Sequence, residues 1–170
     1  MAARLEKLIS GGQTGVDRAA LDAALEVGIE IEGWCPKRRR AEDGTIPERY
    51  PLTETPERGY RARTRRNVED ADGTLVLNWG PLDGGTALTV RHARQAGKPC
   101  LVVQLEDGLE PAVFRAWLAD HSIGVLNVAG PREGKRPGVR AAALACMTAL
   151  LRAVVFEGRR DEATALERPS

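Results

Sequence analysis

Five short runs rich in valine, isoleucine and leucine alternate with helical patterns along the 170 residues of the chain. The runs are KLIS near Leu8, IEIEGW near Ile31, TLVLNW near Val76, PCLVVQL near Val102 and IGVLNVAG near Leu126. Nearly continuous apolar strands between helices are typical of parallel strands covered on both faces. The alternation therefore predicts a single α/β sheet of about five strands, doubly wound and mostly parallel, which is a Rossmann-like fold.

Helical periodicity predicts the elements between these strands. The expected helices cover residues 14–27, 60–71, 86–96, 111–121 and 136–156. The length indicates one domain over residues 1–157, and the polar end of the chain indicates a flexible tail over 158–170. The last helix is apolar on most sides, so we expect it to be deeply packed or to lie in a subunit interface.

The overall charge of the chain is only +1, but the charge is unevenly distributed. The segment Trp34–Arg66 contains ten basic and five acidic residues. A local positive field of this kind attracts a small anion more readily than a duplex, although a solvated arginine-rich loop has the same composition. With 4% aromatic residues, a stacking surface for single-stranded nucleic acid is not expected either.

Three cysteines lie far apart in the sequence, at Cys35, Cys100 and Cys146. Their odd number indicates free thiols in a reducing compartment, and without a CxxC pair we expect no metal site. Basic neighbours could lower the pKa of Cys35, although a buried inert thiol is more common. The N-terminus lacks the apolar core of a signal peptide, and the longest uncharged run is too short for a membrane span. We therefore expect a cytoplasmic protein.

The segment SGGQTG ends the first predicted strand and opens the first helix. Its glycines let the backbone approach a ligand closely, and the free amides and dipole of the helix start favour an anion. The candidate binding residues here are Gly11, Gly12, Gln13, Thr14 and Gly15. The segment is neither GxGxxG nor a P-loop, and a tight turn without a ligand explains the same glycines.

A second glycine-rich helix start, NWGPLDGGTALT, follows the third predicted strand. Its Gly84, Gly85 and Thr86 open the next helix, with Thr86 placed as a cap or as a donor to a phosphate. Two such starts at adjacent strand ends would form one anion cradle with two sides. Asp17 and Asp83 would repel a phosphate, so each either supports its own helix start or accepts a hydrogen bond from a sugar or heterocycle.

Four segments of the chain resemble the molybdenum cofactor carrier family, a Rossmann-like group related to LOG and lysine-decarboxylase-like proteins. The segments are SGGQTGVDRAALDAAL, GWCPKRRRAEDGTIPERYPLTET, YRARTRRNVEDADGTLVLNWGPLDGGTALT and AGKPCLVVQL, and they cover most of Ile9–Leu105. The resemblance implies an α/β fold, an oligomer of identical subunits and binding of molybdenum cofactor, a pterin phosphate that holds an oxo-metal. Arg38 departs from the resemblance, because it stands where we expect glycine.

The related LOG proteins are nucleotide phosphoribohydrolases with the motif PGGxGTxxE. When the chain is aligned on Gly85 and Thr86, Thr89 stands where the glutamate belongs. A threonine cannot supply the carboxylate that this chemistry needs, although Glu42, Asp43 or Asp83 could substitute from another loop. Hydrolysis is therefore weakened but remains an alternative.

The sequence leads to one main hypothesis, a non-catalytic carrier of a phosphorylated anionic cofactor. Molybdenum cofactor (molybdopterin) is the expected cargo. The alternatives are a LOG-type hydrolase of a nucleoside monophosphate and a nucleotide-sensing module that uses the same pocket. The candidate cofactor-binding residues are Gly11, Gly12, Gln13, Thr14, Gly15, Asp17, Lys37, Arg39, Arg40, Trp79, Asp83, Gly84, Gly85 and Thr86. The expected partners are the small anionic ligand, further copies of the chain as a dimer or tetramer, and molybdoenzymes or cofactor-synthesis proteins, but neither nucleic acid nor a membrane.

Overall fold

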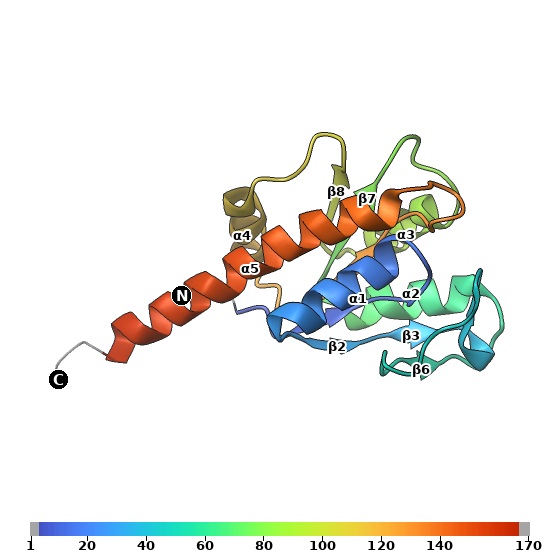
Figure 1. The fold of residues 1–170 in the computed structure, drawn as a ribbon, viewed down its shortest axis with the longest axis horizontal. Coiled ribbons are helices and arrows are strands. Elements are labelled where there is room, and N and C mark those ends of the chain that lie inside the picture. The colour runs from blue at the N-terminus through green and yellow to red at the C-terminus, as the bar shows by residue number, and fades with distance from the viewer. Residues whose placement is uncertain (1–3, 167–170) are drawn as a thin grey trace.

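A computed structural model describes residues 4–166, and its centre is a parallel sheet of five strands (Figure 1). The strands are β1 (Lys7–Ile9), β2 (Glu30–Glu32), β7 (Gly73–Asn78), β8 (Cys100–Gln104) and β9 (Val125–Ala129). They lie in the order β2-β1-β9-β7-β8, and every neighbouring pair is parallel. The predicted Rossmann-like α/β fold and its five strands are confirmed.

Helices cover both faces of this sheet. They are α1 (Val16–Val27), α2 (Tyr60–Asp70), α3 (Gly84–Gln95), α4 (Pro111–Asp120) and α5 (Val139–Leu166). Helices α1 and α5 pack along each other, whereas α2 packs against α3 (Figure 1). The main apolar core contains Leu75 and Leu77 of β7, while the residues that alternate with them, Thr74 and Asn78, are buried and polar. Because side chains alternate across a strand, the face of β7 opposite the main core is the more polar one.

The order of the strands corrects one expectation from the sequence. The two glycine-rich helix starts follow β1 and β7, but these strands are not adjacent, because β9 lies between them. Leu8 of β1 pairs with Leu126 of β9, and Thr74 of β7 pairs with Asn127 of β9. The loop after β9, residues 130–138, therefore lies between the two glycine-rich loops.

The long connection between β2 and α2 is ordered by short elements of its own. Strand β3 (Trp34–Cys35) pairs with β6 (Thr53–Glu54), and β4 (Arg40–Ala41) pairs with β5 (Gly44–Thr45). A 3-10 turn over Lys37–Arg39 precedes β4 and contains Arg38 at φ 63°. This left-handed conformation favours glycine, so it explains physically why glycine is expected where Arg38 stands.

Helix α5 is longer than the sequence predicts. The expected helix ends at residue 156 and a flexible tail follows, whereas the structure continues the helix to Leu166. Ion pairs from Arg115 to Glu157 (2.8 Å) and from Arg4 to Glu162 (2.9 Å) connect this extension to the body. Flexibility of the tail stays a prediction, and residues 167–170 lie outside the described part.

Helix α5 is also unusually apolar. Within residues 4–166 it is the one helix long and apolar enough, by length and composition alone, to cross a membrane. However, its Val139, Ala143, Met147 and Leu151 are buried in the main core, and the helix packs along α1. One side of α5 therefore lies in the core, and the C-terminal part of α5 projects beyond the sheet (Figure 1).

Candidate anion-binding site

Three loops meet at the carboxyl ends of β1, β9 and β7. They are residues 10–15, 130–138 and 79–83, and each leads into a helix. The amide of Val16 donates to the Pro131 carbonyl (3.2 Å), and Nε of Arg136 donates to the Trp79 carbonyl (2.9 Å). The middle loop therefore connects the other two. In an open parallel sheet, ligands bind beyond this edge.

The glycines of the first loop make room for neighbouring protein atoms. A Cβ at Gly15 would lie 2.4 Å from the Pro131 carbonyl oxygen, and one at Gly12 would lie 2.5 Å from Leu52. A Cβ at Gly11 would lie 1.8 Å from Nη1 of Arg63. Because protein groups already occupy these spaces, the close approach expected for a ligand is made here by the chain itself.

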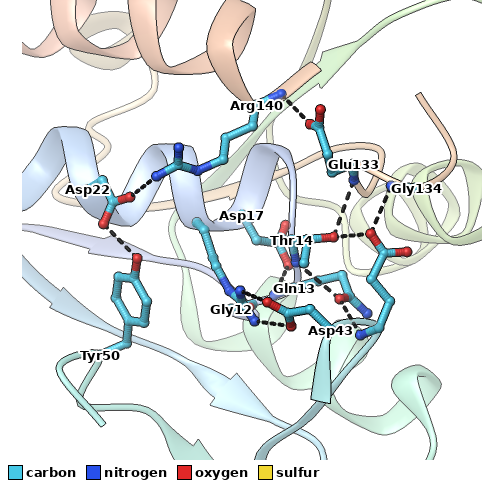
Figure 2. A network of polar contacts seen from close by, with 12 residues as sticks. Gly12, Gln13, Thr14, Asp17, Asp22, Asp43, Tyr50, Glu133, Gly134 and Arg140 are labelled. Atoms are coloured by element: carbon cyan, nitrogen blue, oxygen red, sulfur yellow. Dashed lines mark hydrogen bonds and ion pairs between the residues drawn. The ribbon is translucent and has the colours of Figure 1, made fainter. Parts of the chain in front are cut away.

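Two amides of the first loop are bonded to side chains of the protein (Figure 2). The amide of Gln13 donates to Asp17 (3.2 Å), and the amide of Thr14 donates to Oε1 of Gln13 (3.0 Å). The same Gln13 oxygen accepts a bond from the amide of Glu42 (3.0 Å), and the Thr14 hydroxyl contacts the Glu42 carboxylate. These bonds fasten the loop to the 41–43 segment.

Two carboxylates that could have served a hydrolase are held by arginines. Nη2 of Arg18 donates to Asp43 (2.8 Å), and this hydrogen bonding lowers the pKa of the Asp43 carboxyl. Glu42 pairs with Arg132 (3.0 Å) and accepts a bond from the Gly134 amide (2.8 Å). Neither carboxylate is placed as a free general base in this structure.

A buried ion pair lies beside the first loop. Asp17 is 2% exposed and is 3.2 Å from Nη1 of Arg63. Burial raises the pKa of the Asp17 carboxyl, while Arg63 and the Gln13 amide act in the opposite direction. Nε of Arg63 is buried without a hydrogen-bond partner among residues 4–166, and the guanidinium lies over the Tyr60 ring. Arg63 belongs to the basic Trp34–Arg66 segment, but it is not among the binding residues predicted from the sequence.

The 79–83 loop and the start of α3 that follows it are open. Gly84 lies at φ 53°, and no atom lies within 4 Å of the position of a Cβ at Gly85. Asp83 is the N-cap residue of α3, but its side chain makes no capping hydrogen bond. Thr86 is buried, and the Thr89 hydroxyl donates to the Gly85 carbonyl (3.0 Å). Thr89 therefore bonds the backbone of its own helix where the LOG motif would carry a catalytic glutamate.

Two cations that were not among the predicted binding residues, Lys135 and Arg136, lie at this open start. Nζ of Lys135 contacts Asp83, and Nη2 of Arg136 is 3.5 Å from the same carboxylate. The Lys135 ammonium lies 2.7 Å from where a Cβ of Gly84 would stand. Hydrogen bonding from Lys135 lowers the pKa of the Asp83 carboxyl. The available signal was GPREGKRPG, a glycine- and proline-rich basic loop after the last apolar strand.

The remaining basic candidates lie in the 36–41 segment. The Arg39 guanidinium donates to four backbone carbonyls, those of Ile46, Pro47, Tyr50 and Leu52, and so organises its own loop. Lys37 is exposed, and Arg40 lies over the Tyr60 ring at 5.5 Å from its centre. For all three, a role in binding stays a prediction.

Cys35 does not have the low pKa that its basic neighbours could produce. The residue is fully buried, and burial raises the pKa of its thiol despite the nearby Arg39. An inert core thiol fits these surroundings better than a nucleophile.

Comparison with known proteins gives one family and one solved structure. The model of the circularly permutated YpsA SLOG family matches residues 8–151. The crystal structure of a "Putative molybdenum carrier protein" from Syntrophus aciditrophicus SB is 46% identical. The match covers 88% of this chain and 96% of that one, with a TM-score of 0.83. None of the curated proteins matches the chain.

Proposed function

Because the chain belongs to the circularly permutated YpsA SLOG family, we propose that it is a non-catalytic carrier of a phosphorylated anionic cofactor, with molybdenum cofactor as the cargo. The observation that supports this most directly is the pair of cations, Lys135 and Arg136, beside the open glycine start of α3. The name of the 46% identical relative is consistent with a molybdenum-related ligand.

The chemistry of this site suits a terminal phosphate. The first amides of a helix and its dipole favour an anion, and ionised donors form the stronger hydrogen bonds to phosphate oxygens. Gly85 leaves space for such a group, and Lys135 and Arg136 supply two positive charges. Carriage needs no acid or base catalysis, so the arginine-held carboxylates of Glu42 and Asp43 are no obstacle to it.

A hydrolase is the less favoured reading of the same residues. Thr89 replaces the glutamate of the LOG motif, and Glu42, Asp43 and Asp83 are each paired with a cation. No specific contact among residues 4–166 favours N-glycosidic cleavage over binding. The hydrolase is therefore kept as an outcome of the experiment.

The experiment is anaerobic equilibrium binding of molybdenum cofactor, with AMP as competitor and an assay for released adenine. We expect the cofactor to bind and no adenine to form. Gly85→Asp places a carboxylate in the open start, where no neighbour resists it, so the fold should survive while binding is lost. Gln95→Asp adds the same charge to the exposed far end of α3 and is the matched control.

Two outcomes would contradict the proposal. Adenine release from AMP without binding of the cofactor would make the chain a nucleotide hydrolase. Full affinity in Gly85→Asp would remove the open start of α3 as the site, whatever the ligand is.

We further propose a cytoplasmic homo-oligomer, either a dimer or a tetramer, that exchanges its cargo with molybdoenzymes or cofactor-synthesis proteins. The projecting part of α5 supports an oligomer, because Phe156 is 62% exposed there and Leu166 is 88% exposed. Exposed apolar side chains of this kind are candidate contacts between copies of the chain. Sedimentation at micromolar concentration tests this, and a monomer would refute it.

A further inference from the structure

We propose that Asp83 is an internal competitor for the anion site: its carboxylate holds Lys135 and Arg136 until an oxyanion of the ligand displaces it. The inference rests on the proposed function, because it concerns how the same site is regulated. It makes Asp83 a residue that sets binding strength, in place of the capping or ligand-accepting roles that the sequence left open.

The orientation of Asp83 is the first argument. Aspartate is among the preferred N-cap residues, and its carboxylate normally accepts a bond from an amide of the first helical turn. Here the side chain makes no such bond and instead meets Nζ of Lys135 and Nη2 of Arg136 (3.5 Å). The first amides of α3 therefore lack the cap that Asp83 could provide, while the two cations share its single negative charge.

The exposure of the contact is the second argument. The Asp83 side chain is 50% exposed, and those of Lys135 and Arg136 are 31% and 23% exposed. The ion pair beside the first loop is different, because Asp17 and Arg63 are 3% and 13% exposed. Ion pairs open to water contribute little, so an arriving anion can replace the Asp83 carboxylate but not the buried Asp17.

A buried polar atom near the same loop is an independent argument. Asn78, the last residue of β7, is 1% exposed, and its Nδ2 donates to the Gly80 carbonyl (2.9 Å). Its Oδ1 is buried without a hydrogen-bond partner among residues 4–166. Buried acceptors are nearly always satisfied, so this oxygen is a candidate acceptor for a donor group of the ligand at the base of the 79–83 loop.

The ionic state of Asp83 is consistent with competition. The hydrogen bond from Lys135 lowers the pKa of Asp83, so its carboxylate is charged at neutral pH and occupies the cations when no ligand is present. A phosphate monoester carries close to two negative charges at this pH and can engage both Lys135 and Arg136. The ligand class that best displaces Asp83 is therefore a dianionic oxyanion group.

The test compares the affinity for inorganic phosphate, AMP and molybdenum cofactor in the wild type and in Asp83→Asn. Asparagine has the same shape and is an equally good N-cap, so the helix start should persist. Release of an exposed ion pair predicts about two- to fivefold tighter binding in the variant. Thermal unfolding of both proteins checks that the fold is intact.

A second variant separates competition from a general change of charge. Glu42→Gln removes the negative charge that pairs with Arg132, a residue of the same loop as Lys135 and Arg136, and leaves those two cations paired with Asp83. Competition predicts that Asp83→Asn strengthens binding by clearly more than Glu42→Gln does. Equal effects of the two variants would overturn the inference.

The remaining outcomes separate the inference from the proposed function. If the wild type binds and Asp83→Asn binds equally well or more weakly, the inference alone is overturned. Weaker binding by the variant would make Asp83 a direct ligand contact. Absence of binding of all three probes to both proteins would overturn the anion site, and the inference with it. Binding of phosphate only to Asp83→Asn would support competition.

Discussion

The two glycine-rich helix starts look alike in the sequence but differ in the folded protein. The start after β1 is closed: Gly12 and Gly15 face Leu52 and Pro131, and two amides of the loop, those of residues 13 and 14, bind side chains of the protein. The start after β7 is open: Gly85 has no neighbour within 4 Å, and two cations lie beside it. One cluster of glycines serves packing, and the other leaves its helix start open.

The difference shows that a glycine motif indicates room beside the backbone, but it does not indicate whether protein atoms or a ligand occupy that room. At the first start, the partners are residues from the 36–59 connection and from the loop after β9. At the second, the same absence of a Cβ leaves the helix start accessible. Substitutions at the two starts should therefore have different effects on stability and on anion binding.

Gly15→Ala is expected to damage the fold severely. The residue lies at φ 79°, and a Cβ would be 2.4 Å from the Pro131 carbonyl oxygen, so both strain and overlap oppose the change. We expect a loss of at least about 3 kcal/mol in the free energy of unfolding, measured with urea.

Gly28→Ala is the matched control for the overlap. Gly28 also has a positive φ, 82°, but nothing lies within 4 Å of a Cβ there, so only the backbone strain, about 1 kcal/mol, is expected. If Gly15→Ala is no more damaging than Gly28→Ala, the first start is not closed in the way described.

The closed side should also show a distinctive alkaline response through Tyr50. Burial and the hydrogen bond to Asp22 (2.6 Å) raise the pKa of Tyr50 from 10.0 to about 12. The folded state therefore keeps this proton more tightly than the unfolded state does. Stability from Tyr50 is full below pH 10 and is lost as the pH rises to about 12.

The measurement is the free energy of unfolding between pH 9 and 12 in the wild type and in Tyr50→Phe. The wild type should lose up to about 2 kcal/mol more than the variant over this range. Parallel curves for the two proteins would show that Tyr50 is not held as the structure indicates.

Lys135→Gln should weaken anion binding on the open side. Removal of a charged donor from a phosphate is expected to lower the affinity about tenfold. Arg132→Gln removes a cation from the same loop that is paired with Glu42 at the closed side, so we expect less than about a twofold loss. Binding of inorganic phosphate to both variants, measured by calorimetry, tests the contrast, and equal losses would contradict it.

Gly85→Ala is expected to have the smallest effect. No atom opposes a Cβ at this position, and alanine favours a helix, so the free energy of unfolding should stay within about 1 kcal/mol of the wild type. Thermal unfolding measures this. A large destabilisation would mean that the second start is as tightly packed as the first.

Much of the fold follows from local patterns. The strands near Leu8, Ile31, Val76, Val102 and Leu126 were all predictable, because apolar runs between helices produce a buried parallel sheet. The end of α5 was not predictable, because its composition is that of a polar tail. The ion pairs that connect it to the body come from Arg4 and Arg115, which are distant in the sequence. The glycine expected in place of Arg38 was informative, since this position does adopt a left-handed backbone.

The sequence alone determined the fold class, the glycine-rich helix starts and the family, because these depend on residues close together along the chain. The tertiary structure decided which start is open and which cations accompany it. That outcome depends on β9 entering the sheet between β1 and β7, which brings Pro131 against one start and Lys135 and Arg136 beside the other. Strand order is a property of contacts between distant segments, so no local pattern could reveal it.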